Sequence, residues 1–110
     1  MKIYDHVVPA RTQAAGALAL TGADVPNMPT ASKHAVAVVR KTATAGTIGI
    51  RIKPARCDTF MTLRAGGNAT IFDMSATADP QWFGFEGPID AIEITPTSAN
   101  GTFDVSLTGW

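Results

Sequence analysis

The sequence is poor in the residues that build disulfide-stapled, metal-bound or nucleic-acid-binding domains. It contains one cysteine, Cys57, so no disulfide can form within the chain. No Cys/His spacing matches a structural zinc site. Its nine basic and nine acidic residues cancel, whereas a dedicated nucleic-acid-binding domain is usually basic. We therefore expect no metal, no cofactor and no nucleic-acid partner.

Long apolar runs are also missing. The longest one near the start, residues 14–20, has seven residues, and a membrane-spanning helix needs about 20. The residues before this run include Asp5, His6 and Pro9 instead of a basic leader, so we expect neither a membrane span nor a signal peptide. A lone cysteine fits a reducing compartment, and the cytoplasm is the expected place of synthesis.

Motifs that carry catalysis are absent as well. The Gly66-Gly67 pair lacks the Lys-Ser/Thr pair that follows the glycines of a phosphate-binding loop. Cys57 and His34 are the one candidate thiolate–imidazole pair, but no third, orienting residue is indicated, and a small buried apolar residue is the commoner role for a free cysteine. Asp79 and Glu86 flank an aromatic segment, but nothing in the sequence fixes the separation that paired catalytic carboxylates require. We predict that the chain is not an enzyme.

Alternation of apolar and polar residues is what the sequence does contain. Residues 47–53 place isoleucine at every second position, and residues 102–108 place Phe, Val and Leu in the same way. This period of two predicts strands with one buried and one wet face. About six to eight short strands predict an all-β chain folded as an antiparallel β-sandwich, either jelly-roll or immunoglobulin-like. Turn signals predict three hairpins, formed by residues 35–41 with 47–53, 58–64 with 69–74, and 89–95 with 102–108.

The first third of the chain is patterned differently. It contains three prolines and little alternation beyond residues 2–8. We expect residues 1–32 to form an extended N-terminal arm and residues 33–110 to form the β-sandwich domain. A disordered tail and an ordinary first strand of the same sandwich are the alternatives.

The zero net charge hides a segregation of charge along the chain. Residues 33–64 hold seven bases and one acid, whereas residues 65–110 hold six acids and no base. Such patches can pair between copies and close into rings, or pair across strands within one sheet. We favour pairing between copies, and the candidate interface charges are Arg40, Lys41, Arg51, Lys53, Asp90, Glu93 and Asp104.

Large aromatics gather in the segment 79–88. Trp82 with a neighbouring phenylalanine can plug an open end of the sandwich, or it can stand exposed as a binding anchor. Trp82 and Phe85 with Glu86 can also form a platform for a sugar ring. Trp110 can cap the core or contact a neighbouring subunit. The candidate interface anchors are Trp82, Phe85 and Trp110.

The C-terminal region carries a resemblance. Residues 87–96, GPIDAIEITP, and residues 100–109, NGTFDVSLTG, are two strand-like segments joined through a glycine turn. In this style the region 34–110 resembles small β-rich virion proteins of tailed bacteriophages. The resemblance covers no catalytic or binding positions.

That resemblance implies a non-enzymatic structural protein of the virion, made in the host cytoplasm. It would be a capsid decoration (cement) protein that assembles in symmetric copies, or alternatively a neck or tail accessory protein. Its partners would be copies of itself and other virion proteins, such as a major capsid protein. A glycan-binding β-sandwich module that uses Trp82 and Phe85 is the competing class.

Overall fold

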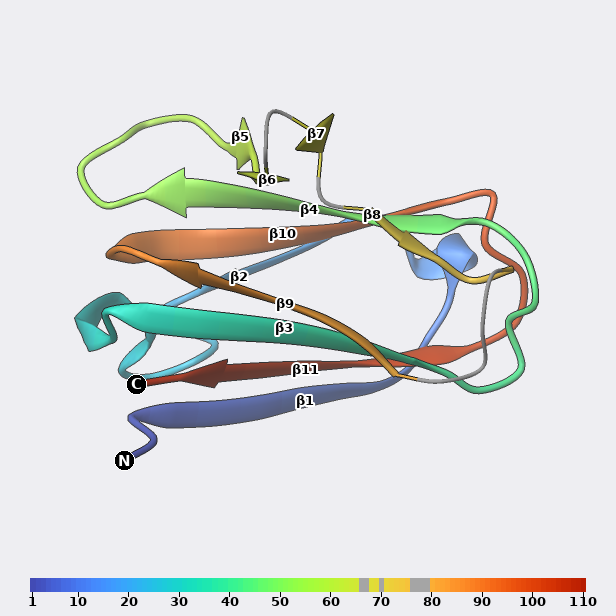
Figure 1. Cartoon of the computed structure of the whole chain (residues 1–110), viewed down its shortest axis with the longest axis horizontal. Helices are drawn as coiled ribbons and strands as arrows, with labels where there is room; N and C mark the ends of the chain where they lie inside the picture. Colours follow the sequence, from blue (N-terminus) through green and yellow to red (C-terminus); the bar gives the residue numbers. More distant parts are fainter. Residues whose placement is uncertain (66–67, 70, 76–79) are drawn as a thin grey trace.

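The chain folds into two packed antiparallel sheets, as a computed structural model shows (Figure 1). The structure describes residues 1–65, 68–69, 71–75 and 80–110. The four-stranded sheet has the order β1-β11-β3-β9, and its strands are β1 (Tyr4–Arg11), β11 (Phe103–Gly109), β3 (Lys33–Arg40) and β9 (Gln81–Glu86). The five-stranded sheet has the order β2-β10-β4-β5 with β8 also on β4, and its strands are β2 (Leu18–Thr21), β10 (Ile89–Thr97), β4 (Thr47–Pro54), β5 (Met61–Thr62) and β8 (Ile71–Asp73).

Short elements complete the fold. A small ribbon pairs β6 (Arg64–Ala65) with β7 (Asn68–Ala69) beside the five-stranded sheet (Figure 1). Two single 3₁₀ turns, η1 (Gln13–Ala15) and η2 (Met28–Thr30), are the helical elements of the described residues.

Strand pairing is nested along the chain. β1 pairs with β11, β2 with β10, β3 with β9, and β4 with β8, so that early strands pair with late ones. This nesting, folded into two sheets, is the jelly-roll arrangement. The predicted antiparallel β-sandwich is confirmed, and of the two topologies that the sequence left open the pairing selects the jelly roll.

Consecutive long strands lie in opposite sheets, so two of the three predicted hairpins are wrong. β3 and β4 do not pair with each other, and neither do β10 and β11. Each of these strands has one apolar face, and an arch between sheets lets the two faces meet across the core. In the third predicted hairpin Arg64 pairs with Ala69, and the glycines predicted for its turn lie outside the described residues.

The two arches are bonded to each other at one end of the sandwich. Backbone N–H groups of Lys41, Thr42 and Ala43 all point to the carbonyl oxygen of Thr102, each at 3.1 Å. The Asn100 Oδ1 accepts hydrogen bonds from the backbone N–H groups of Thr44 at 2.7 Å and Ala45 at 3.0 Å. The loops that cross between the sheets therefore hold one another in place.

Residues 1–32, predicted as an arm outside the domain, contribute two strands to the sandwich. β1 pairs with β11 along its length, and β2 pairs with β10. The segment also places apolar side chains in the core, namely Tyr4, Leu20, Val25, Met28 and Ala31. The physical reason is the nesting: in a jelly roll the last strand of the chain needs the first one as a neighbour. Of the alternatives to an arm, the ordinary first strand of the sandwich is the one that residues 4–11 form.

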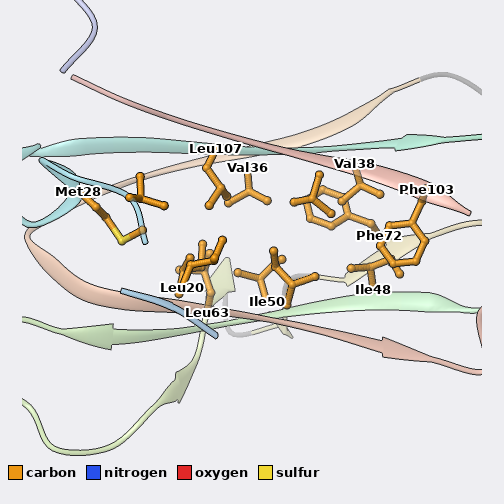
Figure 2. Close-up of a cluster of buried hydrophobic side chains, with 14 of the residues drawn as sticks. Leu20, Met28, Val36, Val38, Ile48, Ile50, Leu63, Phe72, Phe103 and Leu107 are labelled. Carbon is orange, nitrogen blue, oxygen red and sulfur yellow. The ribbon is translucent and has the colours of Figure 1, made fainter. Parts of the chain in front are cut away.

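The core fills the space between the sheets. Figure 2 shows Val36, Val38 and Leu107 of the four-stranded sheet pointing toward Ile48 and Ile50 of the five-stranded sheet. Each of these five residues has at most 1% of its surface exposed to solvent. The strands therefore use one face for the core, and this leaves the outer face of each sheet for other contacts.

Candidate binding face

The outer face of the four-stranded sheet is built largely from small side chains. The register aligns Val7, Ser106, Ala37 and Trp82 in one row across β1, β11, β3 and β9. Next to it, in the same strand order, lies the row Asp5, Thr108, Ala35 and Gly84. Small residues in the second row leave a low floor beside the indole of Trp82.

Trp82 stands on this face and not in the core. Its side chain is 71% exposed, although burying a large apolar side chain is worth about 1.5–3 kcal/mol. A Cβ atom placed on Gly84 would lie 3.6 Å from Cζ3 of Trp82, so the indole leans over the glycine. Exposed tryptophans with open surroundings are typical of binding anchors. The interpretation of Trp82 as a plug for an open end of the sandwich does not fit this exposure.

Trp110 forms the opposite side of a cleft. Its backbone N–H donates to the Lys33 carbonyl oxygen at 2.9 Å, and its carbonyl oxygen accepts from the N–H groups of Ser32 and Lys33 at 2.8 and 3.2 Å. These bonds hold the residue beside β3, with 41% of its surface exposed. Between Trp82 and Trp110 lies a cleft of about 270 Å³, with Ala35 among the residues that line it.

Two opposite charges border the same cleft. Lys33 lies directly across from Glu86 in the β3–β9 register, and both residues are exposed. The ion pairs found within the described part of the chain do not include either of them. The Lys33 ammonium is therefore available as a donor and the Glu86 carboxylate as an acceptor.

Sequence reasoning missed Lys33, Ala35 and Gly84 as members of this site. The signal was present, because a period of two over residues 33–40 places Lys33 and Ala35 on one face. The same period over residues 81–86 places Gly84 with Trp82 and Glu86. What the sequence could not supply was the pairing of these two segments as neighbouring strands.

Phe85 lies on the other face of β9. It is half-buried, and its ring stacks on the imidazole of His34 with centroids 5.1 Å apart and planes inclined by 21°. Trp82 and Phe85 are three positions apart on a strand, which sends their side chains to opposite faces. The two rings therefore do not lie side by side on one face, although Phe85 lines the same cleft as Trp82 and Trp110.

His34 is the buried polar residue of the core, and both of its ring nitrogens are bonded. Nε2 lies 3.0 Å from the Gly87 carbonyl oxygen, and Nδ1 lies 2.7 Å from the Tyr4 hydroxyl. A carbonyl only accepts, so Nε2 carries the proton and Nδ1 accepts from the tyrosine. Burial lowers the pKa of His34 from its ordinary 6.5, against the opposing effect of the Gly87 bond, and burial raises the pKa of Tyr4 to about 12.

The candidate thiolate–imidazole pair of Cys57 with His34 is not available in this arrangement, since Tyr4 and Gly87 take both imidazole nitrogens. Cys57 is a half-buried free thiol. Among residues 1–65, 68–69, 71–75 and 80–110, no three His, Cys, Asp or Glu side chains gather as metal ligands. Within the same residues no helix has the length and apolar character that crossing a bilayer requires.

Four of the predicted interface charges pair inside the subunit. Arg51 Nη1 lies 3.1 Å from Glu93 Oε1, and the two residues face each other in the β4–β10 register. Lys41 Nζ lies 3.6 Å from Asp104 Oδ2, and Asp104 also accepts from the backbone N–H of Ala10 at 2.9 Å. Cross-strand pairing within a sheet, the alternative left open by the sequence, thus describes Arg51 with Glu93, and Lys41 pairs with Asp104 from just beyond the end of β3. Their role in contacts between copies stays a prediction.

The other three predicted charges have separate surroundings. Arg40 Nη1 donates to the Met74 carbonyl oxygen at 2.9 Å, which ties β3 to the turn after β8. Asp90 Oδ2 accepts from the backbone N–H of Arg56 at 3.3 Å. Lys53 is half-buried on β4 opposite Ala91. The structure therefore does not gather the seven charges into one patch.

Comparisons with known proteins return nothing for this chain. No protein-family model, no curated protein and no solved structure matches it.

Proposed function

We propose that this chain is a non-enzymatic structural protein of a phage virion, and specifically a capsid decoration protein that docks through the outer face of its four-stranded sheet. The observation that carries the proposal is the row Val7, Ser106, Ala37 and Trp82, which crosses all four strands. Val7 is 52% and Trp82 71% exposed at the two ends of this row. Small side chains between two exposed apolar ones allow a flat protein surface to approach closely.

The resemblance of residues 34–110 to small virion proteins supports the same function. Jelly rolls recur in viral capsid proteins and also in lectins. Because one fold serves many functions, the topology alone does not choose between these uses. The row favours a protein partner, because it crosses all four strands and a sugar ring covers a much smaller surface.

The charge pairs change the expected nature of the contact. Arg51 with Glu93 and Lys41 with Asp104 satisfy each other within one subunit. Docking through the row from Val7 to Trp82 should therefore depend mainly on apolar contact, and added salt should weaken it little. This revises the expectation that opposite charges join neighbouring copies.

Sedimentation of particles tests the proposal. Particles pelleted from a lysate of cells that encode the chain should contain it in stoichiometric amount, and the Ala37→Lys and Val7→Lys variants should remain in the supernatant. Thr62→Lys, an exposed position on the five-stranded sheet, is the matched control and should pellet like the parent. Circular dichroism verifies that each variant is folded. A parent chain that never pellets with particles contradicts the proposal.

A further inference from the structure

The cleft between Trp82 and Trp110 combines Trp82, one end of the docking row, with groups that lie outside that row. Both tryptophans of the chain line it, Trp82 from β9 and Trp110 from the position directly after β11. One side presents the exposed indole of Trp82, and the edge presents the donor Lys33 and the acceptor Glu86. An exposed aromatic ring beside polar side chains that can still form hydrogen bonds is typical of a small-ligand site.

We propose that this cleft is a saccharide-binding site, in which one pyranose ring stacks on the indole of Trp82. A pyranose has an apolar face of C–H groups and a rim of hydroxyls, and each hydroxyl both donates and accepts. The indole matches the apolar face. Lys33 donates to rim oxygens, and the Glu86 carboxylate accepts from rim hydroxyls.

The size of the cleft matches one ring. Its volume of about 270 Å³ lies just below the range of about 300–1,000 Å³ for drug-sized ligands. Gly84 and Ala35 form its floor, so a ring can approach the sheet closely beside the indole. Longer saccharides would continue over the neighbouring Asp5–Gly84 row.

Charge argues against the other ligands that stack on aromatics. A nucleotide carries a phosphate, and Glu86 at the cleft would repel it while Lys33 alone attracts it. An amphipathic helix needs a groove that receives several successive apolar side chains, which exceeds this cleft. A proline-rich peptide is the remaining rival, because such peptides also dock on aromatic grooves.

The site is held in shape before any ligand arrives. Trp82 lies on β9, which is paired with β3 from Lys33 to Val38. The backbone of Trp110 is bonded on both sides to Ser32 and Lys33. Positioning fixed by strand pairing reduces the ordering cost of binding. The proposal does not rest on the capsid role, because Trp82 alone is shared, whereas Lys33, Glu86 and Trp110 lie outside the row from Val7 to Trp82.

Intrinsic fluorescence is a direct readout, since every tryptophan of the chain borders the cleft. The full chain is titrated with hexasaccharides of glucose, mannose, galactose, rhamnose and N-acetylglucosamine, and with a proline-rich decapeptide. We expect at least one saccharide to shift the emission with a dissociation constant of about 1 mM, as a single stacked ring would give. Saturation-transfer NMR with the same saccharide measures binding independently of the tryptophans.

Variants locate the site. Trp82→Ala should weaken binding by more than about tenfold, and Trp82→Phe should recover part of it. Glu86→Ala should weaken binding several-fold, with partial recovery in Glu86→Gln, which keeps an acceptor. Met61→Ala removes an exposed apolar side chain of the five-stranded sheet and should leave binding unchanged.

Two results would overturn the proposal: no saccharide in the panel binds, whether or not the peptide does, or a bound saccharide keeps its affinity in Trp82→Ala. Val7→Lys separates this proposal from the capsid role. It should abolish pelleting with particles and leave saccharide binding intact, so either function can fail without the other.

Discussion

The ring of Tyr4 reaches His34 across the backbone of Gly109. Tyr4 and His34 are both register partners of Gly109, on either side of β11. The tyrosine hydroxyl then lies 2.7 Å from Nδ1 of His34. A Cβ atom on Gly109 would collide with the Tyr4 ring, so the absence of a side chain at this position makes the hydrogen bond between β1 and β3 possible.

Gly109→Ala should therefore destabilise the fold. The new methyl group must displace the Tyr4 ring, which costs about 1–3 kcal/mol for overpacking, and the lost hydrogen bond adds about 1 kcal/mol. Urea unfolding should show a free energy of unfolding lower by about 2–4 kcal/mol. Gly49→Ala is the control, because among the residues that the structure describes its Cβ would come within 4 Å of the Thr95 carbonyl oxygen alone, at 3.7 Å. Equal stability of the two variants would contradict the role of Gly109.

The buried imidazole makes stability depend on pH. Because the pKa of His34 is lower in the folded chain than its ordinary 6.5, the unfolded chain takes up the proton first as the pH falls. The free energy of unfolding should be at its highest above pH 6.5. It should fall as the pH drops from 6.5 to the lower pKa of His34 in the folded chain. The slope in that window should reach at most about 1.4 kcal/mol per pH unit.

Two measurements check this prediction. Urea unfolding is measured from pH 4 to 8 at intervals of about half a pH unit. The parent chain should show the pH slope in its free energy of unfolding, and His34→Gln should not. NMR titration of the imidazole C–H resonances in the folded parent gives the pKa of His34 directly. A His34 pKa at or above 6.5 in the folded chain would contradict the prediction.

Removal of residues 1–32 should unfold the chain. This segment supplies the only register partner of β11 on one side, and it buries Tyr4, Leu20 and Met28 in the core within the described structure. Each large apolar side chain removed from a core costs about 2–5 kcal/mol, and a domain has about 5–15 kcal/mol in total. Circular dichroism and NMR dispersion of the truncated chain should show no fold. Removal of Met1 and Lys2, both exposed, is the control and should be tolerated.

The sandwich was predictable from local patterns, whereas its connectivity was not. Isoleucine at every second position of residues 47–53 identifies a strand with one buried face, and that strand is β4. The connection from β3 to β4 is short enough for a hairpin, and nothing local distinguishes it from an arch. In the folded chain the arch packs against the loop near Ala99, where a Cβ on Gly46 would strike the Ala99 backbone. Contacts between segments fifty residues apart leave no local pattern.

The binding face was predictable in part. Trp82 was identified from its aromatic segment, and its exposure agrees with an anchor. Phe85 was assigned to the same site because it is close in sequence, although alternation along a strand separates the two side chains. Trp110 reaches the cleft through its backbone bonds to Lys33, a contact that spans most of the chain.

A double-mutant cycle on Arg51 and Glu93 tests whether their charge pair works within one subunit. The two groups lie 3.1 Å apart with 45% and 19% of their side chains exposed. We expect a coupling energy of about 0.2–1 kcal/mol in urea unfolding, as partly exposed cross-strand pairs give. The exchanged pair Arg51→Glu with Glu93→Arg should recover part of the stability that either single change loses. Light scattering should give one molar mass from low to high salt. If the molar mass drops as salt is added and the coupling energy is zero, the prediction is wrong, and Arg51 and Glu93 instead take part in an interface between copies.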